Sequence, residues 1–118
     1  MEETTNATPT TDSNAYNAAL AKLLGKLKKD MGAKQVRQGY HGTGSQAHSR
    51  QMWVRLANGR LLDLWLEAGY VQIGGVIRGT GLGENQRYIR HNGASPAETY
   101  AEVLRVLKTI PAPVPAAQ

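Results

Sequence analysis

The chain has 118 residues, with 14 lysine and arginine residues against 9 aspartate and glutamate residues, for a net charge of +5. This length predicts one domain, and the lack of cysteine excludes disulfides and thiolate metal sites. No apolar run approaches the roughly 20 residues that a membrane-spanning helix needs, and the polar start of the chain is unlike a secretory signal. We therefore expect a soluble, cytoplasmic protein.

The two ends of the chain differ in composition from the middle. Residues 1–13 are acidic, rich in threonine and without apolar periodicity, which is typical of a disordered tail. Residues 111–118 are rich in proline and alanine, which favours an extended tail. A single domain is therefore predicted over residues 14–110. Since the first tail contains three acidic residues and no basic ones, the remainder of the chain carries a net charge of +8.

A helix is predicted near each end of the domain. Apolar residues recur every three or four positions over about residues 14–31, which is the pattern of an amphipathic helix. The second helix is predicted over about residues 96–109. Ser95 and Glu98 form a capping-box pattern at its start, with Pro96 at the first helical position.

A β-hairpin is predicted between these helices. An Asn-Gly pair at positions 58 and 59 separates two strand-like segments, residues 51–57 and 60–66. Asn-Gly favours a two-residue turn, which places Leu56 opposite Leu61. A third strand, residues 70–77, follows a second tight turn.

Counting through the two turns assigns alternate residues to the two faces of the sheet. The face predicted to pack in the core carries Trp53, Leu62, Leu64, Leu66, Val71 and Ile73. The opposite face carries Met52, Val54, Leu56, Asp63, Trp65 and Gln72. Two weaker strand patterns, residues 34–41 and 87–91, extend the sheet.

The predicted fold class is α+β. A small antiparallel sheet of three to five strands is expected to be covered on one face by an N-terminal and a C-terminal helix, in the order α-β-β-β-(β)-α.

The arginine content of the domain is the strongest functional signal. Arginine suits phosphate binding and base stacking, and an exposed aromatic ring beside arginines is typical of single-stranded nucleic-acid binding. We therefore expect a small non-catalytic module that binds DNA or RNA through a basic sheet edge and loops. The predicted contact residues are Arg37, Arg50, Arg55, Arg78, Arg87, Arg90 and Trp65.

A protein interface is the alternative function. An apolar patch on the outer face of the hairpin is typical of a docking surface. This patch is predicted to contain Met52, Val54, Leu56, Trp65 and Tyr70. It would suit a homodimer, or an adaptor or inhibitor of another protein, for example a phage- or plasmid-encoded inhibitor of a host defence complex.

Catalysis and cofactor binding have less support in the sequence. The glycine-rich residues 74–83 resemble a phosphate-binding loop, but a strand-like segment follows where such a loop needs a helix. No spacing of His, Asp and Glu matches a metal site, so no metal or cofactor is predicted. His41, His48 and His91 leave a metal-independent ribonuclease as a third option, with a histidine as general base.

Overall fold

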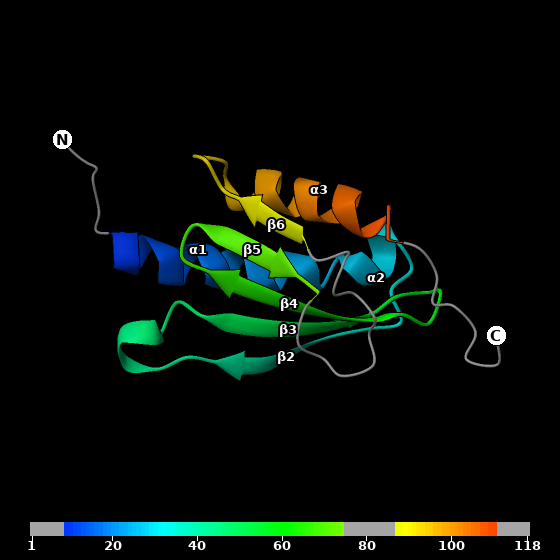
Figure 1. Ribbon diagram of the computed structural model, residues 1–118, viewed down its shortest axis with the longest axis horizontal. Helices are drawn as coiled ribbons and strands as arrows, with labels where there is room; N and C mark the ends of the chain where they lie inside the picture. Colours follow the sequence, from blue (N-terminus) through cyan, green and yellow to red (C-terminus); the bar gives the residue numbers. More distant parts are fainter. Residues whose placement is uncertain (1–8, 75–86, 111–118) are drawn as a thin grey trace.

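An antiparallel sheet packed against helices makes up the structure, a computed structural model that describes residues 9–74 and 87–110 (Figure 1). In chain order its elements are α1 (Pro9–Leu24), α2 (Leu27–Asp30), β2 (Gln35–His41), the 3-10 helix η1 (Gly44–Gln46), β3 (Arg50–Arg55), β4 (Leu61–Glu67), β5 (Tyr70–Ile73), β6 (Arg87–Arg90) and α3 (Pro96–Leu107). None of the helices in these ranges is long and apolar enough to cross a membrane.

The sheet has five strands in the order β2-β3-β4-β5-β6, and each strand runs antiparallel to its neighbours. This arrangement confirms the predicted α+β class, and both of the weaker strand patterns join the sheet. The predicted third strand is shorter than expected, because β5 ends at Ile73 and positions 75–77 lie outside the described residues.

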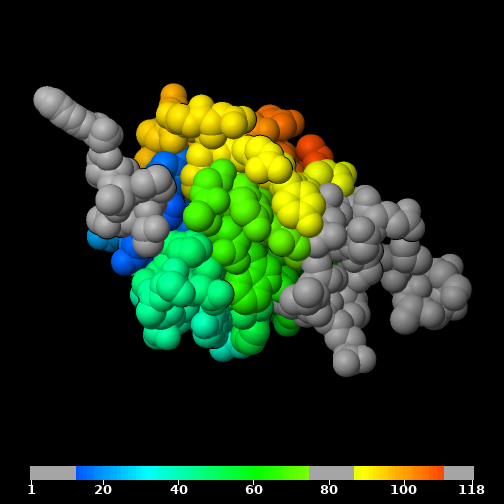
Figure 2. All heavy atoms as spheres, turned by 60° about the vertical axis from the view of Figure 1, so that its left-hand side comes forward, coloured from blue at the N-terminus to red at the C-terminus, as the bar shows by residue number. Residues whose placement is uncertain are grey.

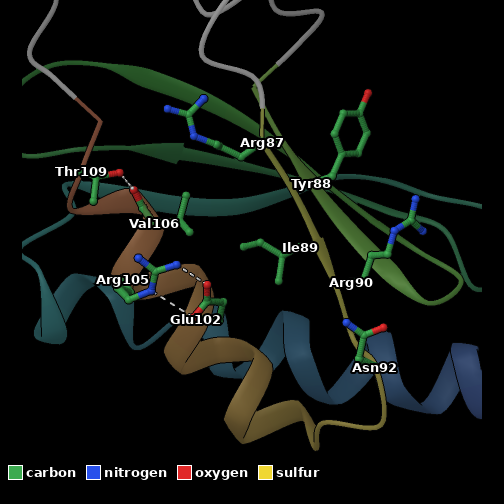
Figure 3. A pocket seen from close by; sticks show the side chains of 9 residues that line it. All are labelled: Arg87, Tyr88, Ile89, Arg90, Asn92, Glu102, Arg105, Val106 and Thr109. Atoms are coloured by element: carbon green, nitrogen blue, oxygen red, sulfur yellow. Dashed lines mark hydrogen bonds and ion pairs between the residues drawn. The ribbon is translucent and has the colours of Figure 1, made fainter.

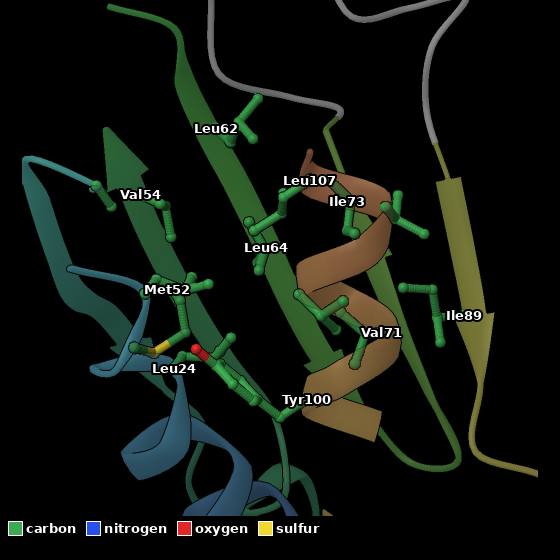
Figure 4. Close-up of a cluster of buried hydrophobic side chains, with 14 of the residues drawn as sticks. Leu24, Met52, Val54, Leu62, Leu64, Val71, Ile73, Ile89, Tyr100 and Leu107 are labelled. Carbon is green, nitrogen blue, oxygen red and sulfur yellow. The ribbon is translucent and has the colours of Figure 1, made fainter. Parts of the chain in front are cut away.

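The hydrophobic core lies between one face of the sheet and the helices (Figure 4). The sheet contributes fully buried residues such as Leu64, Val71 and Ile73, which lie beside Tyr100 and Leu107 of α3. The two N-terminal helices add a stripe of leucines, and each fully buried leucine contributes about 1.5–3 kcal/mol of hydrophobic free energy. This stripe consists of Leu20, Leu24 and Leu27.

The register of the β3–β4 hairpin differs from the prediction by one residue. The Leu56 amide donates to the Arg60 carbonyl at 2.8 Å, so the turn has three residues rather than two. Gly59 takes the left-handed conformation at the end of the turn, with a φ of 91°. A three-residue loop of this kind combines a type I turn with a left-handed residue. As a result Val54 pairs with Leu62, and Arg55 pairs with Leu61.

The shift by one residue exchanges the two faces of β3, because neighbouring strand residues point in opposite directions. Met52, Val54 and Leu56 were expected on the outer face but lie in the core, with exposed fractions of 4, 0 and 2%. Trp53 was expected in the core but is only half-buried. The predicted outer apolar patch is therefore wrong for these three core residues.

The N-terminal helix begins and ends earlier than predicted. It starts at Pro9, so positions 9–13 of the predicted tail are helical, and it breaks at Gly25 before the short helix α2. Glycine has low helix propensity, which favours a break at this position, and Leu24 and Leu27 on either side of it are both fully buried. At the other end of the domain, the predicted capping box is confirmed, because Ser95 and Glu98 exchange hydrogen bonds of 2.8 and 3.1 Å.

Three connections meet beside α1 at one end of the sheet, as Figures 1 and 2 both show. Asn17 of α1 is fully buried, and its Nδ2 donates to the carbonyls of His48 and Glu67 at 2.9 and 3.0 Å. The hydroxyl of Tyr16 donates to the Ala94 carbonyl at 2.6 Å. These bonds join α1 to the β2–β3 connection, the last residue of β4 and the β6–α3 connection, so the helix fixes the end of the sheet.

The observed register predicts a large and a small change in stability for two nearby residues of β3. Met52→Ala should lower the free energy of unfolding by about 2–5 kcal/mol, because it creates a cavity in the core. Arg55→Ala should change the free energy of unfolding by no more than about 0.5 kcal/mol, because Arg55 is exposed. Urea unfolding measures both values. Equal, small losses from the two variants would contradict the register.

Candidate functional site

The outer face of the sheet is the candidate site. The described helices pack on the opposite face, so no described element covers this one. Its side chains come from alternate positions of all five strands, and they are mainly aromatic, arginine and glutamine residues. The aromatic residues depart from the usual pattern of an antiparallel sheet, in which the solvated face is polar.

One row of this face runs across the whole sheet and contains three aromatic side chains. Cross-strand pairing aligns Tyr40 with Gln51, Gln51 with Trp65, Trp65 with Gln72, and Gln72 with Tyr88. The rings of Tyr40 and Trp65 lie 6.2 Å apart at an angle of 56°. Tyr40 and Tyr88 are 46 and 58% exposed, whereas Trp65 is half-buried. We call Tyr40, Trp65 and Tyr88 the aromatic row.

The next row contains a stacked pair of side chains. Arg37 of β2 pairs with Trp53 of β3, and its guanidinium carbon lies 4.3 Å from the centre of the indole ring. The ring packs against the main chain at Gly39, where an added Cβ would come within 3.1 Å of the indole Cε2. Gly39 therefore leaves the space that lets Trp53 lie against β2.

A buried carboxyl group orients the central indole of the aromatic row. Asp63 points toward the outer face but is fully buried, and it accepts hydrogen bonds from Gln51 Nε2 at 2.9 Å and Trp65 Nε1 at 3.2 Å. Burial raises the pKa of Asp63, although these two hydrogen bonds oppose the rise. The bond to Nε1 restricts the orientation of the Trp65 side chain, so its ring is preorganised.

Half of the six predicted arginines lie on the outer face. Those on the outer side of their strands, and exposed, are Arg37, Arg55 and Arg90. Arg50 lies elsewhere, because its guanidinium donates to Asn14 Oδ1 at 3.2 Å and Gln38 Oε1 at 3.4 Å, beside α1. Arg78 lies outside the described residues.

Arg87 lies in a groove of about 460 Å³ between β6 and α3 (Figure 3). Arg105 and Glu102 of α3 form an ion pair along this groove. The predicted basic surface is thus divided between the outer face and the edge of β6.

The sequence did not single out three of the aromatic residues on the outer face. Tyr40 and Tyr88 belong to the two weaker strands, whose faces were not assigned, and Trp53 was assigned to the core. Alternation in Arg87-Tyr88-Ile89-Arg90 could have placed Tyr88 outward, since Ile89 is the one apolar aliphatic residue of that strand. Tyr70, predicted in the protein interface, is half-buried, and its ring lies 6.1 Å from that of Tyr88.

The three histidines lie at the α1 end of the sheet, and each makes a different contact. His41 Nε2 lies 2.9 Å from the Ala47 carbonyl, and His48 Nε2 lies 3.8 Å from the carboxylate of Glu67. His91 stacks on Tyr16 with a ring distance of 4.1 Å, and burial lowers its pKa. In the described part of the chain, no hydrogen bond links one of these rings to another.

Comparison with known proteins assigns the chain to no family, since no family model, curated protein or solved structure matches it. Within residues 9–74 and 87–110, no group of three or more His, Cys, Asp and Glu side chains is arranged to bind a metal ion. The site must therefore be interpreted from its own chemistry.

The raised pKa of Asp63 predicts a specific pH dependence of stability. A carboxyl group whose pKa is higher in the folded than in the unfolded chain stabilises the fold below the unfolded value of 3.8, and this contribution is lost as pH rises through the folded pKa. Asp63→Asn cannot titrate, and its amide can still accept from Trp65 and donate to a reoriented Gln51. The stability of the variant relative to wild type should therefore increase as the pH rises above about 4.

Chemical denaturation at a series of pH values measures this difference. Parallel pH profiles for wild type and Asp63→Asn would contradict the assigned environment of this carboxyl group.

Proposed function

We propose that the protein is a non-catalytic module that binds single-stranded nucleic acid on the outer face of its sheet. The observation that carries this proposal is the aromatic row, with arginines beside it, on a face that no described element covers. Aromatic rings stack on nucleobases irrespective of sequence, and arginines beside them contact the phosphates. Neither a metal nor a cofactor is part of this proposal.

The geometry of the rings favours single strands over duplexes. A ring on a sheet surface can stack only on a base whose face is free, and stacking between neighbouring base pairs hides those faces within a duplex. Tyr40 and Tyr88 lie on the two edge strands, with Trp65 on the central strand between them. A strand that crosses the sheet from β2 to β6 would therefore meet all three rings in turn.

Electrostatics supports the same ligand. The chain without its acidic N-terminal residues 1–13 carries a net charge of +8, which attracts polyanions over distances of about a Debye length. Arg37 and Arg55 lie in the rows on one side of the aromatic row, and Arg90, paired with Tyr70, lies in the row on its other side. The positive charges thus lie on both sides of the aromatic row, where the phosphates of a bound strand would run.

A protein ligand is the second candidate for the same face, because tyrosine, tryptophan and arginine are also enriched in protein interfaces. The outer face supports a protein interface less well than the sequence did. Three of the five predicted interface residues lie in the core, which leaves Trp65 and Tyr70. Salt separates the candidates, since contacts to phosphates release counterions and weaken steeply with ionic strength.

Trp65→Ala should weaken binding of a fluorescently labelled single-stranded oligonucleotide roughly 5- to 150-fold, because it removes the central stacking ring. Trp65→Phe keeps a ring and should restore most of the affinity, although it loses the hydrogen bond to Asp63. Fluorescence anisotropy at several salt concentrations measures both variants. The wild-type affinity should fall as salt rises.

A double variant on the helical side of the molecule provides the control for charge. Lys28→Ala with Lys29→Ala removes two exposed positive charges from α2 and should change the affinity no more than about twofold. If wild type binds neither single-stranded DNA nor RNA at low salt, the proposed function is wrong. A large loss in the double-lysine variant, with wild-type affinity in Trp65→Ala, would show that binding depends on net charge rather than on this face.

A further inference from the structure

A pocket lies at the β2 edge of the outer face, beside the aromatic row. It has a volume of about 210 Å³ and is lined by Gln35, Arg37, Trp53, Arg55 and Leu61. Sites for drug-sized ligands usually measure about 300–1,000 Å³, so this pocket suits a single planar ring system. Its walls are the stacked side chains of Arg37 and Trp53, the amide of Gln35, the guanidinium of Arg55 and the side chain of Leu61.

The pair of Arg37 and Trp53 gives this pocket a flat wall. The guanidinium lies 4.3 Å from the centre of the indole, and Arg37 is exposed, so one face of the guanidinium is covered by the ring. A guanidinium group is planar and stacks on aromatic systems, whereas an ammonium group does not. The opposite face of the guanidinium is therefore suited to stack on a nucleobase.

From this arrangement we infer that the pocket binds one unpaired nucleobase, with Arg37 between the base and Trp53. This inference rests on the proposed function and extends it, because it assigns Arg37 a stacking role instead of a phosphate contact. Arg55 lies on the neighbouring strand directly opposite Gln35, where its charge can meet the phosphate of the bound nucleotide. Purines have a larger stacking surface than pyrimidines, so the pocket favours a purine.

The test compares Arg37→Lys with Arg55→Lys in full-length protein, using single-stranded oligonucleotides that carry 2-aminopurine at successive positions. Both substitutions keep the positive charge. Arg37→Lys should weaken binding about 5-fold or more while the dependence of affinity on salt stays unchanged. Arg55→Lys should bind within about twofold of wild type. In wild type, the 2-aminopurine fluorescence should be quenched most strongly at one position, and Arg37→Lys should abolish that maximum.

Thermal unfolding of both variants shows whether they remain folded, and Arg37 is exposed, so a change in melting temperature is not expected. The inference is overturned if Arg37→Lys binds as wild type does, or if it binds with a lower dependence on salt, since that change marks a lost phosphate contact. Either of these results leaves the proposed function intact. A wild-type protein that binds no single strand overturns both.

Discussion

The pairing of β3 with β4 is the constraint on which the rest of the structure depends. Val54 lies opposite Leu62 because the turn between the strands has three residues and ends with Gly59 in the left-handed conformation. A shift by one residue would exchange the two faces of β3, and it would remove Met52 and Val54 from the core while burying Trp53. Since burial of each such side chain is worth about 1.5–3 kcal/mol, the core selects this register strongly.

The same alternation that fills the core also creates the outer face. Aromatic and arginine side chains lie there because their strand neighbours are needed inside, and the face is held in order by contacts of its own. Asp63 accepts a hydrogen bond from Trp65, and Gly39 leaves room for the Trp53 ring. Burial of a carboxyl group opposes folding, so Asp63 is unfavourable for stability, while it restricts the ring beside it. A buried group that lowers stability but orients a neighbouring ring is typical of a binding surface.

Much of the fold could be predicted from local patterns. The apolar stripe of α1, the capping box at Ser95 and the tight turn before Tyr70 all identify elements without knowledge of tertiary structure. The hairpin register could not be predicted in the same way, because Asn58-Gly59 is compatible with turns of two or three residues and only the packed core decides between them. Because a two-residue turn was assumed, Trp53 was predicted in the core instead of on the outer face. The arginines were identified by residue type, but the face on which each one lies depends on strand order and register, which local patterns do not determine.

The central claim is that the outer face, and not the helical side, binds single-stranded nucleic acid. The chain has two tryptophans, and both lie on this face, so their indole N–H signals in a two-dimensional NMR spectrum report on it directly. Addition of a short single-stranded oligonucleotide should shift both indole signals, while the amide signals of α2 and α3 stay in place. Unchanged indole signals together with shifted signals from α2 or α3 would contradict the account.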